Sequence, residues 1–140
     1  MTVRLIKIKK NKIILNRKGN IIKFIDKKTN GFRGFGEIYF SEIKKNKTKG
    51  WNTHHKFFSI ISVPYGKVEF VFFDPKKKIK RFKKIISSKN KNLSIFVPPK
   101  IWYSFKSKTK ISIVVNVLNK IHDPKETGKA DIINGVKIKN

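Results

Sequence analysis

The chain has 140 residues, no cysteine, and 35 lysines and arginines against 8 aspartates and glutamates, which give a formal charge of +27. The lack of cysteine excludes disulfides and thiolate metal sites. No apolar run approaches the roughly 20 residues of a membrane span, and the first ten residues lack the apolar block of a secretory signal. We therefore expect one cytoplasmic domain spanning 1–140, with about 70% of the unfolded chain's surface buried on folding.

The positive charge is typical of nucleic-acid-binding proteins, because phosphates attract lysine and arginine. Of the 35 basic residues, however, 31 are lysine, whereas arginine is the residue that grips phosphates and bases with paired hydrogen bonds. Lysine, isoleucine, asparagine and phenylalanine, which all have codons of A and T alone, make up 77 of the 140 residues. We attribute most of the excess to AT-biased coding and expect neither nucleic acid nor a membrane as partner, although the charge would attract a small anion.

Short runs of isoleucine, valine, phenylalanine and tyrosine, separated by turn residues, predict an all-β protein. Residues 13–15 and 21–25 flank a turn in which Gly19 can take a positive φ, which indicates a hairpin. Turns are also expected at 64–66, at Asp74-Pro75 and at Pro98-Pro99, since proline ends strands. The remaining expected strands are 35–43, 49–63 with a break inside it, 68–73, 93–97, 101–106 and 111–118.

One segment is ambiguous. Residues 76–88 carry Ile79, Phe82, Ile85 and Ile86 at helical spacing, so one short helix competes with a strand. No internal repeat or linker divides the chain. We expect an N-terminal hairpin region at 1–30, a barrel at 31–126 and a polar, partly loose tail at 127–140.

Five stretches in a fixed order are more specific. They are RGFGE at 33–37, KGWNTHH at 49–55, a hydrophobic hairpin at 63–74 that ends in Asp74, VPPKIWYSF at 97–105 and HDPKE at 122–126. Together they resemble the cupin family of nucleotide-sugar epimerases and ketoisomerases, typified by the dTDP-4-dehydrorhamnose 3,5-epimerases and the sugar 3,4-ketoisomerases. The resemblance covers roughly residues 31–126.

The resemblance implies a double-stranded β-helix, the cupin jelly roll, which is usually a homodimer with its ligand inside the barrel mouth. Closing two sheets in this way hides most strand edges and lines a cavity with alternate residues. The implied activity is isomerisation or epimerisation of a nucleotide-linked 4-keto sugar, without a cofactor, in the synthesis of surface polysaccharide such as lipopolysaccharide. A base removes the acidic proton beside the ketone, and an acid returns a proton elsewhere.

The catalytic positions match unevenly. The epimerases' catalytic histidine corresponds to Asn52, their proton-donating tyrosine falls near Asn116 and their assisting lysine near Ser59. An amide cannot act as a base, so 3,5-epimerisation by the usual groups is not expected. His54 matches the second histidine of the ketoisomerases' H-x-H and shares a strand face with Asn52. We predict His54 as the base and Tyr103 as its acid or hydroxyl partner.

Structural interpretations compete with these roles. A single histidine on a strand is more often a hydrogen-bonded polar group than a catalyst, and Tyr103 or Trp102 would serve equally as core residues. His122 would serve equally as a turn residue.

The other predicted site residues bind substrate. By resemblance Arg33 holds the diphosphate and Glu37 a hydroxyl, the alternative being an ion pair between them on one strand face. Lys49 is a second phosphate contact, and Trp51 stacks on the nucleobase or packs in a dimer interface. The predicted substrate-binding residues are Arg33, Glu37, Lys49, Trp51, Asn52 and Asn116.

A cupin metal site is not expected, because the chain has only three histidines and no acidic residue between Glu42 and Glu69. Three functions compete. The first is the sugar-nucleotide isomerase. The second is a catalytically silent cupin that binds a nucleotide sugar or glycan, favoured by Asn52 and Asn116. The third is a β-barrel that binds single-stranded nucleic acid through charge and aromatic residues.

Overall fold

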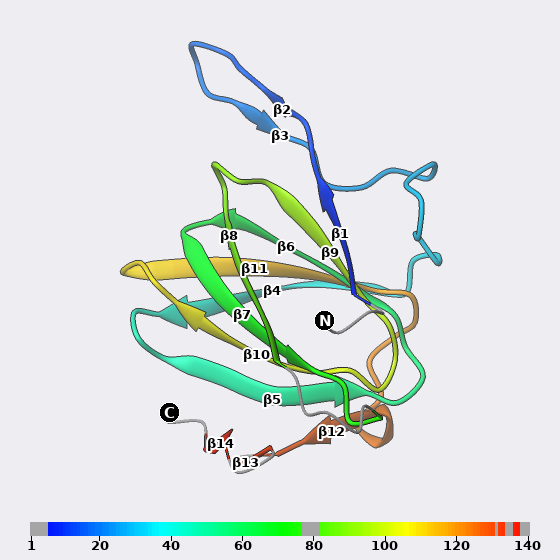
Figure 1. Cartoon of the computed structure of the whole chain (residues 1–140). Helices are drawn as coiled ribbons and strands as arrows, with labels where there is room; N and C mark the ends of the chain where they lie inside the picture. The colour runs from blue at the N-terminus through cyan, green and yellow to red at the C-terminus, as the bar shows by residue number, and fades with distance from the viewer. Residues whose placement is uncertain (1–5, 77–81, 131, 134–135, 138–140) are drawn as a thin grey trace.

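The structure is a computed structural model, and its described residues are 6–76, 82–130, 132–133 and 136–137. Two antiparallel five-stranded sheets face one another (Figure 1). In the first sheet the order is β1 (Lys7–Lys10), β9 (Leu93–Val97), β6 (Ser59–Tyr65), β11 (Ile111–Leu118) and β4 (Glu37–Lys44). In the second it is β12 (Thr127–Lys129), β5 (Thr48–His54), β10 (Trp102–Ser107), β7 (Lys67–Phe73) and β8 (Phe82–Ser88).

The chain changes sheet repeatedly from β4 to β12, which gives the double-stranded β-helix. This confirms the predicted all-β jelly roll. Two short hairpins lie outside the sheets, β2 (Ile13–Ile14) with β3 (Ile21–Ile22) and β13 (Ile132–Ile133) with β14 (Val136–Lys137). Helical structure in the described residues is limited to a 3-10 turn, η1 (Pro124–Glu126). None of the described helical structure is long and apolar enough to cross a membrane.

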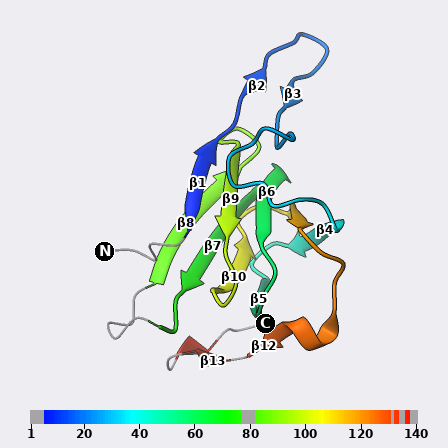
Figure 2. The ribbon, with the colours of Figure 1, turned by 90° about the vertical axis from the view of Figure 1, so that its right-hand side faces the viewer.

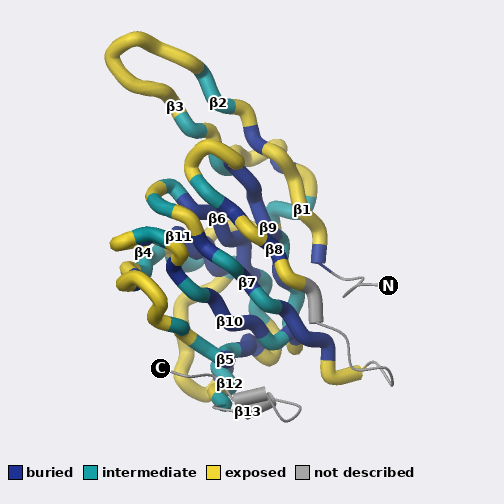
Figure 3. Tube along the Cα trace, turned by 60° about the vertical axis from the view of Figure 1, so that its left-hand side comes forward, coloured by how far each residue is buried: buried dark blue, intermediate teal, exposed yellow. Residues whose placement is uncertain are grey.

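The apolar core lies between the sheets, beneath β6, β7 and β9. Alternate residues of these strands point inward, among them Ile61, Phe70, Phe72 and Ile95, all nearly inaccessible to solvent. Each such side chain contributes about 2 kcal/mol by leaving water. Figure 3 shows this dark band of buried residues, whereas the β2–β3 hairpin that projects from the barrel is mostly exposed.

Most expected strands are present with shifted ends. The break expected within 49–63 separates β5 from β6, and Gly19 in the first hairpin has a φ of 131°. In the ambiguous segment 76–88, residues 82–88 form strand β8 rather than a helix, and residues 77–81 lie outside the described part of the chain.

Two strands of the main sheets, β1 and β12, were not predicted, nor was the short β13–β14 hairpin. The four residues of β1 are all exposed, and their pairing with β9 adds an edge strand that carries little hydrophobic signal. The expected loose tail contributes β12, which pairs with β5 from Thr127 opposite His54 to Lys129 opposite Asn52. Both strands are determined by a distant pairing partner rather than by local sequence.

Candidate active site

Strand β5 presents two polar side chains to the space between the sheets. Asn52 is paired with Tyr103, a core residue of β10, so both point inward. His54 lies two residues further along β5 and shares this face, because side chains alternate along a strand. The predicted neighbours Asn52, His54 and Tyr103 therefore lie on the inner surface of one sheet.

Lys49 reaches the same inner face through a bulge. Between β5 and β10 the register shifts, so that Lys49 lies opposite Phe105 while Asn52 lies opposite Tyr103. An extra residue in one strand brings positions three apart onto one face. Gly50 makes this possible: its φ is 109°, and a Cβ there would lie 2.7 Å from the carbonyl oxygen of Tyr103.

The Lys49 side chain spans the gap between the sheets. Its Nζ donates a 2.8 Å hydrogen bond to the hydroxyl of Ser41 on β4. On β4 the inward positions Glu37, Tyr39 and Ser41 are all partly accessible to solvent. Because the inward positions of β7 are almost fully buried, the space between the sheets is polar and open along β4 and β5 and apolar beneath β7.

A group of three interacting side chains lies in this polar region. The amide of Asn116 on β11 donates to the hydroxyl of Tyr39 at 2.9 Å. Tyr103, on the opposite sheet, interacts electrostatically with Tyr39. The contact links the two sheets at the level of Asn52.

The two tyrosines remain protonated at neutral pH. Burial raises the pKa of Tyr39, with the charge of Glu37 acting in the same direction, while the hydrogen bond from Asn116 and the interaction with Tyr103 oppose the shift. Burial raises the pKa of Tyr103 far above its usual value, because only 4% of this residue is exposed. Both hydroxyls are therefore proton donors.

His54 is the buried imidazole of the site. Only 6% of the residue is exposed, its ring stacks on Phe57 at 6.2 Å between centroids, and its main-chain oxygen accepts from Lys100. Burial lowers its pKa, His122 and His55 lower it further, and the carboxylate of Glu126 opposes the shift. His54 is therefore neutral at physiological pH, the form that accepts a proton.

Glu37 is held at the beginning of β4. Its Oε2 accepts the main-chain N–H of His122 at 2.8 Å. The preceding Gly36 donates to the carbonyl of Leu118, and a Cβ at Gly36 would collide with the backbone of Lys120. The second glycine of the RGFGE stretch therefore allows the close approach that positions Glu37.

Several buried polar atoms of the two sheets, His54 Nδ1 among them, have no hydrogen-bond partner among the described residues. Such atoms are rare in proteins and mark places where polar groups await a ligand or water. Four of them lie on strands, one each on β5 and its partner β12 in the second sheet, and one each on β6 and its partner β11 in the first sheet. They are His54 Nδ1, Ser59 Oγ, Thr127 Oγ1 and Asn116 Oδ1.

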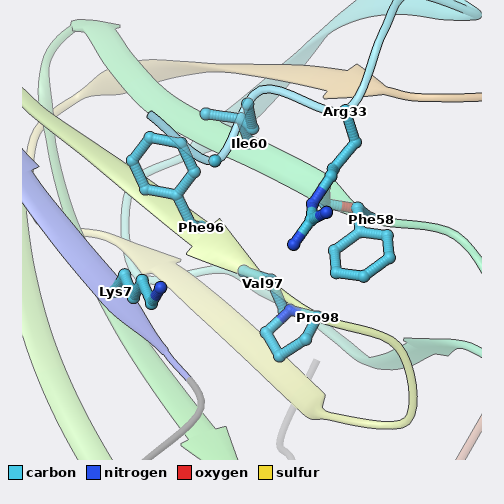
Figure 4. Close-up of a pocket in the computed structure, with 9 residues that line it drawn as sticks. Lys7, Arg33, Phe58, Ile60, Phe96, Val97 and Pro98 are labelled. Atoms are coloured by element: carbon cyan, nitrogen blue, oxygen red, sulfur yellow. The ribbon is translucent and has the colours of Figure 1, made fainter. Parts of the chain in front are cut away.

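Arg33 does not lie with this cluster. The expectation that it shares a strand face with Glu37 is wrong, because β4 begins at Glu37 and Gly34 takes a φ of 97°. Figure 4 shows the Arg33 guanidinium beside the ring of Phe58, 5.1 Å from its centroid, in a pocket of about 70 Å³ also lined by Phe96 and Pro98. The alternative ion pair with Glu37 is not formed, since the one ion pair in the described part joins Lys84 to Glu69.

Trp51 also lies elsewhere. It is 2% exposed and packs with Phe73, Trp102 and Ala130 on the outer face of the second sheet. In Figures 1 and 2 the segment that contains β12 runs beside β5, and Ala130 exchanges two main-chain hydrogen bonds with Trp51. This placement argues against both predicted roles of Trp51, the stacking platform and the dimer contact.

Lys100 stands where the resembled family has glycine, and it adopts glycine's conformation. Its φ is 68°, in the left-handed region. Its N–H donates to the carbonyl oxygen of His54 at 2.7 Å. The corner between β9 and β10 therefore keeps the shape that the motif requires, at the cost of strain in a residue with a side chain.

Tyr39 was not predicted as a site residue. It lies two residues after Glu37 on an expected strand, and the alternation of side chains alone would have placed it on the same face. The residue that engages its hydroxyl, Asn116, lies opposite it on β11, far away in the sequence. In the described residues, no group of three or more histidine, cysteine, aspartate or glutamate side chains lies in an arrangement that could hold a metal ion.

Solved structures share this fold. A dTDP sugar isomerase from Desulfovibrio desulfuricans G20 superposes with a TM-score of 0.87 at 24% identity, over 91% of this chain and 85% of that one. The sugar 3,4-ketoisomerase QdtA from Thermoanaerobacterium thermosaccharolyticum, in complex with TDP, gives 0.77 at 16% identity, over 90% and 88%. The 3,5-epimerase RmlC from Legionella pneumophila Philadelphia 1, in complex with dTDP-4-keto-L-rhamnose, gives 0.78 at 16% identity, over 89% and 71%.

These structures belong to the enzyme group that the sequence motifs resemble, so the expected likeness is confirmed at the level of the fold. No protein-family model matches the chain, and no curated protein matches it either.

Proposed function

We propose that this protein is an isomerase or epimerase acting on a nucleotide-linked 4-keto-6-deoxysugar. One observation carries the proposal: a buried, neutral His54 faces the same inner space as the protonated pair Tyr39 and Tyr103. A base and an acid with separated pKa values are what proton transfer beside a ketone requires. The ligands of the structures with this fold include TDP and dTDP-4-keto-L-rhamnose.

In this mechanism His54 removes the proton from the carbon beside the keto group. The electron pair moves onto the ketone oxygen, and the hydroxyl of Tyr39 donates a hydrogen bond that stabilises the negative charge on that oxygen. Asn116 and Tyr103 hold the Tyr39 hydroxyl in place. Return of the proton from His54 to the former keto carbon, while the proton of the adjacent hydroxyl passes to the old ketone oxygen, moves the ketone to the neighbouring carbon. Protonation of the original carbon from the opposite face by a tyrosine hydroxyl, with His54 keeping the abstracted proton, inverts that carbon instead.

The residue at position 52 narrows the chemistry. The inner face of β5 carries one imidazole, because Asn52 stands where the resembled epimerases have their base. We therefore favour an isomerisation or inversion at one carbon over a 3,5-epimerisation at two. The same asparagine favours the second candidate, a cupin that binds the nucleotide sugar without chemistry.

The two ends of the polar region fit the two ends of the substrate. Lys49 is exposed at the end of this region far from His54, where it would meet the diphosphate. The protein's charge of +27 attracts that anion. Glu37 and Asn52, nearer to His54, would accept and donate hydrogen bonds to sugar hydroxyls. Arg33 lies on the outer face of the first sheet, so we assign it no contact with the substrate.

We also propose a homodimer formed through the outer face of the first sheet. Phe40 is 68% exposed and Ile38 is 47% exposed on β4, next to a pocket of about 250 Å³ lined by Phe24, Val115 and Val117. Because 31% of the residues are charged, an exposed apolar patch on this outer face indicates a binding surface for another protein chain. A second copy presents the same face, as a twofold contact requires.

The proposal also includes a pathway and a compartment. We place the enzyme in the cytoplasm, in the synthesis of a surface polysaccharide such as lipopolysaccharide, with residues 1–140 acting as one unit. Enzymes with this fold include a 4-keto-6-deoxysugar epimerase from the novobiocin cluster of Streptomyces spheroides. Sugars of the 4-keto-6-deoxy class are therefore substrates in more than one biosynthetic pathway.

The test is incubation of the protein with TDP-4-keto-6-deoxyglucose in deuterated water, followed by NMR of the sugar ring. We expect deuterium to enter at one carbon beside the ketone, and the exchange to vanish in His54→Gln. Absence of exchange with thymidine, uridine, guanosine and cytidine diphosphate sugars would reject the enzyme. Binding without exchange, unchanged in His54→Gln, would select the silent cupin instead.

A further inference from the structure

The carboxylate of Glu126 lies near the site, and the proposed mechanism does not use it. Glu126 ends the 3-10 turn η1, and only 8% of the residue is exposed. It is one of 8 acidic residues in a chain with 35 basic ones. Few carboxylates are buried without a strong interaction, because an isolated buried charge is costly.

Glu126 closes the loop that follows His54. Its main-chain oxygen accepts the N–H of His55 at 2.9 Å, and its Oε2 accepts the N–H of Phe57 at 3.3 Å. The ring of Phe57 is in turn stacked against the imidazole of His54, with 17° between the planes. Glu126 therefore fixes both the loop and the aromatic surface against which His54 lies.

The second oxygen of the carboxylate has no partner in the described part of the chain. Glu126 Oε1 and His54 Nδ1 are both buried and both lack a hydrogen-bond partner there. The next residue, Thr127, pairs with His54 across β5 and β12. Glu126 Oε1 can therefore still accept a hydrogen bond, and His54 Nδ1 can donate one when it carries a proton.

We infer that Glu126 is a positioning residue for His54, which orients the imidazole and stabilises the imidazolium formed when His54 takes the substrate's proton. This inference rests on the proposed function for its catalytic part. The physical basis is the attraction between opposite charges that are shielded from water, which is far stronger than at a surface. The carboxylate accepts no proton in this step, since the proton moves from the substrate carbon to His54.

The other ionisable groups near His54 act differently. His122 precedes η1 and His55 follows His54, and both disfavour the imidazolium. Tyr103 on β10 is protonated, and Glu37 on β4 is engaged by the N–H of His122. Glu126 is thus the group that favours the charged form of His54.

The test is Glu126→Gln, which keeps an oxygen for the Phe57 N–H and removes the charge. NMR titration of the His54 ring, assigned with His55→Gln and His122→Gln, should show its pKa falling by about one unit. Deuterium exchange should lose about tenfold in kcat with KM unchanged, the acidic limb of its pH profile should move to lower pH, and Glu126→Asp should restore part of the loss. Glu69→Gln, at the exposed ion pair with Lys84, is the matched control and should alter neither property.

An unchanged His54 pKa in folded Glu126→Gln would overturn the inference. If that variant fails to fold, the wild type decides, because the Glu126 carboxyl carbon should show an inflection at the pKa of His54, and its absence would overturn the inference. Both NMR readouts need no substrate. A coupled His54 and Glu126 in a protein without exchange activity would therefore reject the proposed function and leave the coupling standing.

Discussion

The side-chain amide of Asn116 on β11 donates a 2.9 Å hydrogen bond to the hydroxyl oxygen of Tyr39 on β4. Tyr103, on the opposite sheet, interacts electrostatically with the same hydroxyl group. With its oxygen engaged by these partners, Tyr39 can direct its own proton toward the half-open space beside Asn52. Tyr39 is also more accessible than Tyr103, which is buried behind it. In the proposed mechanism we therefore assign proton donation to Tyr39 rather than to Tyr103, the residue predicted from the sequence.

Replacement of Tyr39 by phenylalanine should therefore abolish most of the exchange reaction. Loss of a positioned proton donor typically costs 10²- to 10⁴-fold in rate, and we expect a fall in kcat of about 100-fold or more with little change in KM. Deuterium incorporation at saturating substrate measures it. Tyr65→Phe, at an exposed tyrosine outside the site, is the control, and equal losses in the two variants would contradict the assignment.

The burial of neutral His54 should make stability depend on pH. Because burial lowers its pKa in the folded state, the unfolded chain binds more protons than the folded one below about pH 6.5. The free energy of unfolding therefore falls as the pH drops through 6.5 toward the folded pKa, and above 6.5 this group contributes no pH dependence.

His54→Gln should remove this part of the pH dependence. Urea unfolding at pH 7 and pH 5 measures it, and the variant should lose less stability between the two than the wild type does. His55 is exposed and is only the last-ranked cause of the lowered His54 pKa, so His55→Gln should keep most of the wild-type pH dependence. A wild-type slope in His54→Gln would show that the imidazole is not buried in the neutral form.

The bulge at Gly50 predicts a large effect of one methyl group. Gly50→Ala places a Cβ 2.7 Å from the Tyr103 carbonyl in a left-handed conformation, and we expect a loss of about 3 kcal/mol from strain and displaced backbone. Gly19 also has a positive φ, but nothing lies within 4 Å of its Cβ position. Gly19→Ala should therefore cost only about 1 kcal/mol, and chemical denaturation of both variants gives the comparison.

The left-handed Lys100 predicts a change in the opposite direction. Glycine relieves about 1–2 kcal/mol of strain at this φ and loses about 0.4–1 kcal/mol through a more flexible unfolded chain. Lys100→Gly should therefore stabilise the protein by up to about 1.6 kcal/mol, measured as a shift in the urea midpoint. Lys100→Ala should not stabilise it, since alanine keeps the strain.

Local sequence predicted the barrel well because its inner strands are short runs of β-branched and aromatic residues bounded by turn residues. Residues 68–73 and 111–118 carry their hydrophobic pattern in their own letters, and both strands appear at those positions or within one residue of them. The glycines of the RGFGE and KGWNTHH stretches also had structural reasons, at Gly36 and Gly50, that a motif alone could not provide.

What the sequence could not predict depends on distant contacts. Arg33 was placed on a strand because the i and i+4 spacing ignores the turn at Gly34, and Trp51 was placed toward the ligand before β12 was known to cover it. Tyr39 contacts Asn116, which lies 77 residues away in the chain. Glu126 lies in the 3-10 turn η1, and its link to His54 arises only where the chain returns to β5. No local pattern contains these relationships.

The exposed apolar face of the first sheet predicts self-association that salt strengthens. Two copies of a chain with a charge of +27 repel one another, and salt screens this repulsion over about 10 Å at 0.1 M, while the contact of Ile38 and Phe40 is apolar. We expect a dimer by light scattering whose dissociation constant decreases between 0.05 and 0.5 M salt, in the range where screening changes most.

Phe40→Lys should yield a folded monomer, because it puts a charge at the centre of this face. The matched change Ile86→Lys, on the outer face of the second sheet where Ile86 is 39% exposed, adds the same charge and should leave the dimer intact. A monomeric wild type at high salt would reject the interface. Equal weakening by both variants would assign the association to charge rather than to the apolar face, because only a local contact distinguishes Phe40 from Ile86.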